Sequence, residues 1–137
     1  MEHPQPAPAK TVLVADDEEG MRKVLERRLL SWGYAVVTAA DGLDVLRVAK
    51  ERRPDLILLD VMMPNLNGLE ACRQLKADNE TRQIPIILVT AKAGQLSGEQ
   101  IEAAGVIASV PKPYDAAELL ALIQKVLGPA GSQGEAR

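Results

Sequence analysis

The sequence predicts an α/β fold in which helices cover both faces of a doubly wound parallel sheet. The first observation is that five short aliphatic runs recur along the chain: TVLVA, YAVVTA, LILL, PIILV and VIASV. Each run is apolar at successive positions, which is typical of strands buried on both faces. The second observation is that helical patterns separate the runs. Strict alternation of this kind favours parallel strands joined by right-handed crossovers.

The expected strands are residues 11–15, 34–39, 56–59, 85–89 and 106–110. The first expected helix, 21–32, has apolar residues at spacings of three and four and stops at Gly33. The other four helices follow polar residues with N-terminal capping spacing: Asp41 with Asp44, Asn67 with Glu70, Ser97 with Gln100, and Asp115 with Glu118. A sheet of this size predicts a flavodoxin-like (βα)5 fold with strand order 2-1-3-4-5.

The composition sets limits on the class of protein. The 137 residues fit one domain, and the net charge of -3 with scattered lysines and arginines argues against a nucleic-acid surface. The single cysteine excludes an intrachain disulfide, and no apolar run is long enough for a signal peptide or a membrane span. We expect a soluble, cytoplasmic protein with a Pro-rich disordered tail at 1–10, a folded domain at 11–127, and a disordered tail or linker stub at 128–137.

Reactive side chains collect at the carboxyl ends of the expected strands. Asp16 and Asp17 follow the first strand, Asp60 the third, Thr90 the fourth and Lys112 the fifth. In the predicted order the first and third strands are neighbours, and a ligand should lie in the crevice at their carboxyl ends. Three carboxylates that converge there need positive charge, because like charges raise one another's pKa. Lys112 supplies one charge, and carboxylate oxygens suit Mg²⁺, with Mn²⁺ as the alternative.

This set of groups is suited to accepting a phosphoryl group. An aspartate can act as a nucleophile and form an acyl phosphate, and the rest of the site then has to position and neutralise charge. Asp60 is the best nucleophile candidate, because it is not adjacent in sequence to another acid.

The chain resembles the receiver domains of two-component response regulators, the CheY-like domains, and looks like a single-domain type. The motifs LVADDE, LILLDVMMPNLNG, IILVTA, AAG and KPY carry the resemblance in this order over nearly all of 11–127. It implies a signalling switch that is not an enzyme, with only weak self-phosphorylation from small donors and weak autodephosphorylation. A histidine kinase or phosphotransfer protein would donate the phosphoryl group, and a downstream protein would read the change; neither nucleic acid nor membrane is an expected partner.

The resemblance also implies a role for each site residue. Asp60 would be the phosphoacceptor and a metal ligand, Asp17 a direct ligand, Asp16 a ligand through water, and Met62 a ligand through its backbone carbonyl. Thr90 would hydrogen-bond the phosphoryl oxygen.

Residues in and just after the expected fifth strand give one more role and one departure from the family. Lys112 would pair with the phosphate or, before it arrives, with Asp60, and the Lys112–Pro113 bond is cis in the family. Ser109 stands where many receivers have an aromatic residue that moves on phosphorylation, and the preceding segment lacks the acids of one common dimer interface. The chemistry at the site is therefore better supported than the route by which a change there would reach the surface, and we do not assume that dimer.

Three alternatives remain open. A receiver-like module that binds a partner without phosphorylation would share the fold. An aspartyl-phosphate hydrolase would normally carry D-x-D on the first strand and a cap, and this chain has DD there. A nucleotide-binding module would need a Gly-rich phosphate loop where the sequence offers DDEEGMR.

The segment 91–104 should fluctuate more than the central strands. Gly94 and Gly98 lie where the fourth helix starts, and glycine in a helical interior costs up to about 1 kcal/mol. We expect faster amide exchange there than in the strands.

Overall fold

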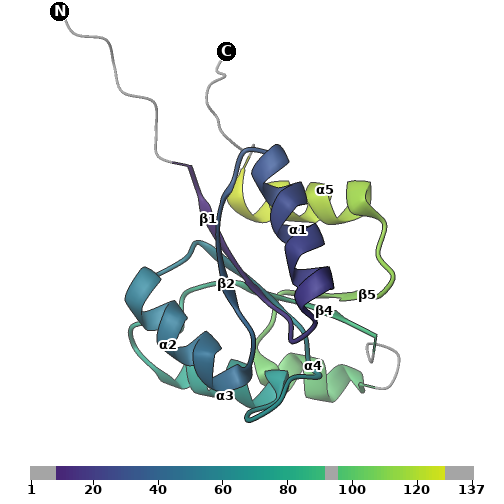
Figure 1. Cartoon of the computed structure of the whole chain (residues 1–137). Helices are drawn as coiled ribbons and strands as arrows, with labels where there is room; N and C mark the ends of the chain where they lie inside the picture. The colour runs from purple at the N-terminus through teal and green to yellow at the C-terminus, as the bar shows by residue number, and fades with distance from the viewer. Residues whose placement is uncertain (1–8, 92–95, 129–137) are drawn as a thin grey trace, which may run out of the picture.

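A computed structural model describes residues 9–91 and 96–128. Most of both expected tails therefore lies outside the described residues, and so does part of the segment expected to fluctuate. Strands and helices alternate along the chain (Figure 1). The strands are β1 Thr11–Ala15, β2 Ala35–Ala39, β3 Leu56–Leu59, β4 Ile86–Thr90 and β5 Ala108–Pro111. The helices are α1 Glu19–Ser31, α2 Gly42–Arg52, α3 Gly68–Ala77, α4 Gly98–Ala104 and α5 Ala116–Leu127.

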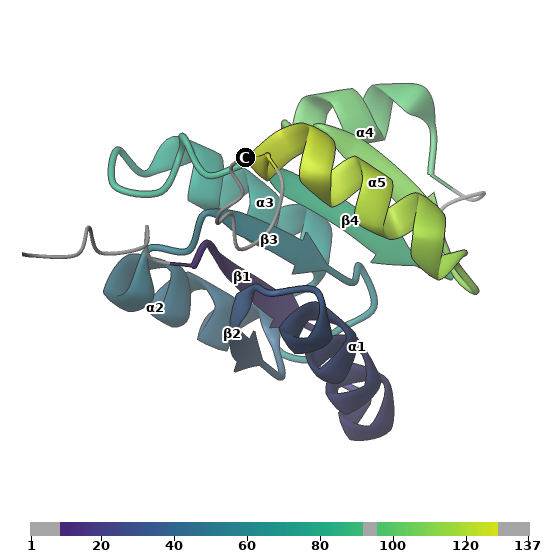
Figure 2. The same cartoon turned by 90° about the horizontal axis from the view of Figure 1, so that it is seen from above.

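The sheet confirms the predicted flavodoxin-like topology. Its five strands are parallel and follow the order β2-β1-β3-β4-β5. Figure 2 shows the strands side by side in this order from β2 to β4. Ala15 at the end of β1 is in register with Leu59 at the end of β3, so the residues that follow these two strands are also neighbours.

Helices cover both faces of the sheet. Helices α1 and α5 lie on one face, and α2, α3 and α4 lie on the other (Figure 1). The core of the first face includes Leu29, Leu58 and Leu119, and that of the second includes Val45, Ile57 and Leu75. Because side chains of β3 alternate between these two cores, its run LILL is buried throughout.

Two details of the strand predictions are wrong. All five strands were expected to be buried on both faces, but β2 and β5 are mostly half-buried, because each lies at an edge of the sheet with one neighbouring strand. The fifth strand was expected from residue 106, but it starts at Ala108. Gly105 ends α4 with a φ of 76°, and Ile107, two residues later, is 51% exposed. Residues 106 and 107 therefore belong to the loop between α4 and β5, although both are apolar.

The four predicted N-terminal caps are confirmed. In each, the side chain accepts a hydrogen bond from the amide three residues on: Asp41 in α2, Asn67 in α3, Ser97 in α4 and Asp115 in α5. Helix α1, which had no recognisable start signal, has no side-chain cap, and it begins two residues before the expected position.

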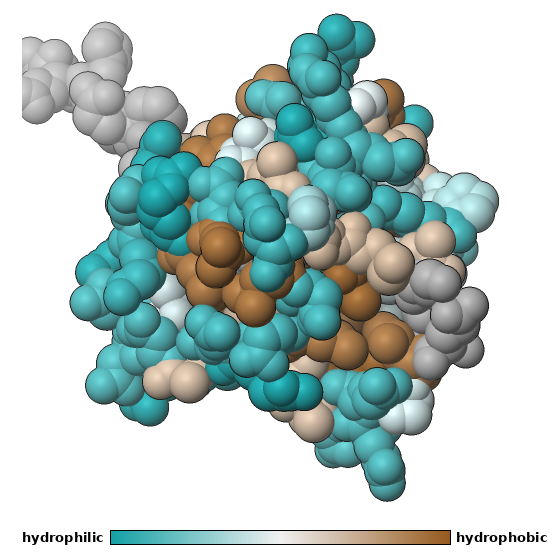
Figure 3. Space-filling view, turned by 60° about the horizontal axis from the view of Figure 1, so that its bottom comes forward, coloured by the Kyte–Doolittle hydropathy of each residue, from teal (hydrophilic) through white to brown (hydrophobic). Residues whose placement is uncertain are grey.

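The surface is mainly polar on the face turned forward in Figure 3, with apolar side chains in patches between the polar ones. Within residues 9–91 and 96–128, none of the helices combines the length and the apolar character that crossing a membrane requires.

Candidate functional site

The backbone carries Asp16 and Asp60 to adjacent positions at the carboxyl edge of the sheet. The amide of Asp16 donates to the carbonyl of Ala39 at 3.2 Å, and the amide of Asp60 donates to the carbonyl of Ala15 at 3.0 Å. These bonds extend the strand pairing by one residue beyond β1 and β3. The two carboxylates therefore lie side by side at the carboxyl ends of β1 and β3, the point at which the strand order reverses.

Three carboxylates meet at this edge. One oxygen from each of Asp16, Asp17 and Asp60 lies within 4.8 Å of the others. Asp16 and Asp60 are 6% and 7% exposed, whereas Asp17 is exposed to solvent. Such close negative charges repel one another, and the repulsion is stronger where burial reduces screening by water.

Lys112 lies between the two buried carboxylates. Its Nζ donates to Asp16 Oδ2 at 2.7 Å and to Asp60 Oδ2 at 3.0 Å. Burial by itself would lower the pKa of Lys112, but hydrogen bonds and charge from Asp16 and Asp60 together raise this pKa above its usual range. The lysine is therefore a stable positive charge in the site at neutral pH.

The loop around Lys112 holds it in place. The Lys112 amide donates to the carbonyl of Thr90 at 3.2 Å, and the Lys112–Pro113 bond is cis, as the resemblance implied. Thr90 ends β4 and is fully buried. It lies on the strand next to β3, which places it at the same edge as Asp60.

Backbone amides hold the second oxygen of each buried carboxylate. Met62 N donates to Asp60 Oδ1 at 3.1 Å, and Glu18 N donates to Asp16 Oδ1 at 2.9 Å. The Met62 side chain points away from the core and is 53% exposed. The loop after β3 thus approaches Asp60 through its backbone, which is compatible with the expected carbonyl ligand.

Residues of α1 and of the segment before α5 also border the site, which the sequence reading did not foresee. Arg22 Nη1 donates to the backbone carbonyl of Asp16 at 2.7 Å. Met21, Leu25 and Tyr114 line a small pocket beside Asp16, Asp60 and Lys112. In the sequence, Met21 and Leu25 belong to a helical stripe, and nothing in that periodicity distinguishes core contacts from contacts to a site.

The donor set fits a hard divalent cation. The groups that could coordinate are oxygens, namely the three carboxylates and nearby backbone carbonyls, and this is the chemistry of Mg²⁺. Asp17 is the solvent-exposed member of the three. The one described cysteine, Cys72, is fully buried in α3 and does not belong to this cluster.

Ser109, where the resemblance led us to expect an aromatic residue, lies in β5. It is paired with Leu88 in the sheet, and its Oγ is buried without a hydrogen-bond partner among the described residues.

The fold and the site together define a class of protein. It is a flavodoxin-like α/β protein with acidic residues and a lysine at the carboxyl ends of the strands, where proteins of this fold bind their ligands.

Comparisons with known proteins identify the family. The model of the response regulator receiver domain matches residues 12–124. The polar-differentiation response regulator DivK of Brucella anthropi is 37% identical over 121 residues, which cover 88% of this chain and 98% of DivK. A probable transcriptional regulator ycf27 of Cyanophora paradoxa is 41% identical, and the match covers 86% of this chain and 48% of that protein.

A solved structure agrees with these relatives. The receiver domain of sensor histidine kinase PA1611 from Pseudomonas aeruginosa superposes with a TM-score of 0.81 and 36% identity, covering 88% of this chain and 99% of that one. It holds a magnesium ion in its active site cleft. The chain therefore belongs to the response regulator receiver domain family, and the resemblance seen in its motifs is confirmed.

Proposed function

We propose that this chain is a phosphorylation-dependent signalling switch in which Asp60 accepts a phosphoryl group in the presence of Mg²⁺. The observation that carries the proposal is the meeting of three carboxylates within 4.8 Å with a lysine 3.0 Å from Asp60. A structural role alone would not explain why this much charge is concentrated at the switch point of the sheet. The family supports the signalling role in general terms.

Asp60 acts as the nucleophile. One of its oxygens forms a bond to phosphorus while the bond from phosphorus to a histidine nitrogen of the donor breaks, and the imidazole leaves with the electron pair. Lys112, already 3.0 Å from Asp60, lies where it can neutralise the added charge, and the Thr90 hydroxyl donates a hydrogen bond to a phosphoryl oxygen. Asp16, Asp17, Asp60 and the Met62 carbonyl would hold the ion. When bound, Mg²⁺ supplies the positive charge that lets anionic donor and acceptor approach.

The proposed partners follow from this chemistry. A histidine kinase or phosphotransfer protein supplies the phosphoryl group, and a downstream protein reads the altered surface, in the cytoplasm. The runner-up function is a receiver-like module that binds its partner without phosphorylation. The observation that favours it is Ser109, whose small side chain cannot make the aromatic movement expected in many relatives.

Incubation with a small phosphodonor and Mg²⁺, followed by intact mass measurement, tests the proposal. We expect a Mg²⁺-dependent gain of one phosphoryl group that is absent in Asp60→Asn. The matched control is Asp55→Asn, the same substitution at the other end of β3, where the side chain accepts a hydrogen bond from Thr11 N and an amide oxygen can replace it. This control should be phosphorylated as the wild type is. Failure of the wild type to form an adduct, with small donors and with histidine kinases, would favour the partner-binding module.

A further inference from the structure

The loop that joins β3 to α3, residues 61–67, is fastened to a second segment of the chain. The first end of this loop lies against Asp60, since Met62 N donates to Asp60 Oδ1. The loop also closes on itself, because Val61 O accepts from both Met63 N at 3.1 Å and Gly68 N at 2.9 Å. Its tip, residues 64–66, projects toward the start of α2.

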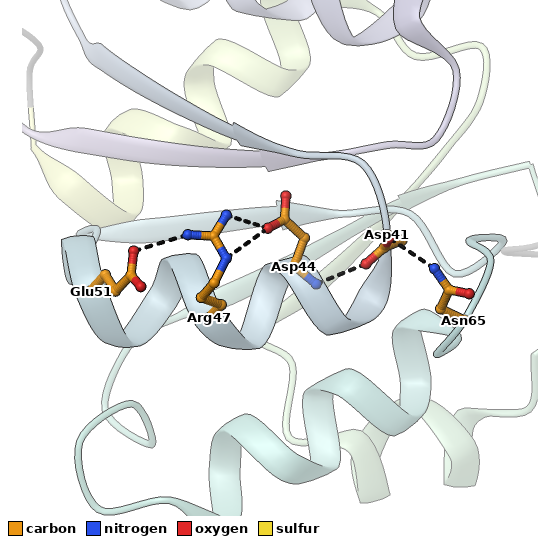
Figure 4. Close-up of polar contacts among 5 residues, drawn as sticks. All are labelled: Asp41, Asp44, Arg47, Glu51 and Asn65. Carbon is orange, nitrogen blue, oxygen red and sulfur yellow. Dashed lines mark hydrogen bonds and ion pairs between the residues drawn. The ribbon is translucent and has the colours of Figure 1, made fainter.

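Asp41 binds the tip of this loop with one of its two carboxylate oxygens. Oδ2 accepts a hydrogen bond from Asn65 Nδ2 at 2.9 Å, while Oδ1 accepts from Asp44 N at 2.8 Å (Figure 4). Helix capping requires only the bond from Asp44 N. The bond from Asn65 Nδ2 links two loops that are 24 residues apart in sequence.

Asn65 has the backbone geometry that this link requires. Its φ of 70° lies in the left-handed region, which among the described non-glycine residues only Arg53 shares. Asparagine tolerates that region better than most residues. The turn at Asn65 and its bond to Asp41 therefore belong to one arrangement.

Gly42 brings the two loops into direct contact. A Cβ at this position would lie 1.8 Å from the carbonyl oxygen of Leu66, and the Gly42 amide is 3.5 Å from the carbonyl of Pro64. Only glycine fits without moving the loop. At the other end of the loop, a Cβ on Gly68 would lie 2.4 Å from the carbonyl oxygen of Asp60.

We propose that Asp41, Gly42 and Asn65 are positioning residues for the metal ion: they hold the loop that carries Met62 in the place from which its carbonyl binds Mg²⁺. This proposal rests on the proposed function. None of the three residues would touch the ion or the phosphoryl group. Their effect is to reduce the freedom of the loop before the ion arrives, which lowers the entropic cost of binding.

Isothermal titration with Mg²⁺ tests the proposal on a set of isosteric variants. Asn65→Asp places a carboxylate opposite that of Asp41, with no hydrogen between them to share, so the link is lost while the turn at 65 is tolerated. We expect the Mg²⁺ dissociation constant to rise about fivefold, the size of effect that one lost hydrogen bond produces. The matched control is Asn67→Asp, which adds the same charge to the same loop. Asn67 uses its side-chain oxygen to cap α3 at Glu70 N, and a carboxylate oxygen can replace it, so affinity should not fall.

The double variant Asp41→Asn, Asn65→Asp provides the rescue. It restores the net charge and reverses the hydrogen bond, with the amide at 41 donating to the carboxylate at 65, and aspartate also tolerates the left-handed region. Wild-type affinity in the double variant, with the loss in Asn65→Asp, supports a direct positioning link. Equal affinities in Asn65→Asp and Asn67→Asp, or no recovery in the double variant, overturn it and leave the proposed function intact. If the wild type itself fails to bind Mg²⁺, the metal site of the proposed function is wrong, and the positioning role falls with it.

Discussion

Cys72 shows how burial decides the chemistry of a single residue. It lies in α3 with no exposed surface, between the helix and the core of the α2–α3–α4 face. Burial raises the pKa of its thiol from 9.0 to about 12, and the nearby Lys76 offsets this only in part. Because the thiolate is the reactive form, the side chain is a packing group in the folded protein.

We predict that a disulfide reagent at about pH 8 labels Cys72 very slowly in the native protein and rapidly after unfolding in urea. The raised pKa also has a consequence for stability. Between pH 9.0 and about 12 the unfolded chain loses the thiol proton while the folded chain keeps it, so the free energy of unfolding falls as pH rises through this range. Cys72→Ala should lack this alkaline component. Labelling of the native thiol at the unfolded rate would contradict the prediction.

Helix α4 shows how a short element depends on its ends. It has seven residues, too few to form a stable helix alone. Ser97 and Gln100 form a reciprocal capping box at its start, with hydrogen bonds of 3.0 and 2.9 Å. At its other end Gly105 has a φ of 76°, and a Cβ there would lie 3.1 Å from the Lys76 side chain. Loss of either end should loosen the whole helix.

Ser97→Ala should therefore lower stability by about 1 kcal/mol and speed amide exchange in α4. Ser31→Ala is the matched control, since Ser31 at the end of α1 only donates to the carbonyl of Arg28. The same exchange measurement tests the expectation that residues 91–104 exchange faster than β3 and β4; residues 92–95 of that segment lie outside the described residues. Equally slow exchange in α4 and in the central strands would show that this part of the expectation is wrong.

At the scale of the molecule, stability should follow the position of a strand in the sheet. Val12 in β1 and Val36 in β2 are register partners, and both contact the core beneath α1 and α5. Val12 is completely buried, because β1 has a strand on each side, whereas Val36 on the edge strand is only half-buried. The two positions therefore carry the same side chain with different degrees of burial.

Val12→Ala should cost about 2 kcal/mol, from lost transfer free energy and an unfilled cavity, and Val36→Ala less than about 1 kcal/mol, since solvent can fill the space. Urea denaturation of both variants measures the difference. A cost for Val36→Ala as large as that for Val12→Ala would mean that the edge of the sheet is covered in solution.

The sequence by itself determined the order of elements, the parallel sheet and the edge at which the charged residues gather. The existence of each strand, the periodicity of each helix and the four caps depend on residues close together in the chain, so local patterns reveal them. The position of Asp60 directly after LILL was sufficient to place its carboxylate at the carboxyl edge. The resemblance carried by the motifs then led to the family.

The tertiary structure decided what depends on distances between remote segments. It decided that β2 and β5 are half-exposed, that Arg22 binds the carbonyl of Asp16, and that Lys112 bridges two carboxylates. It also decided the second role of Asp41. In the sequence Asp41 is a helix cap, and only the folded chain brings Asn65 within hydrogen-bonding distance of its other oxygen, because packing of α2 against α3 and the close approach at Gly42 set that distance.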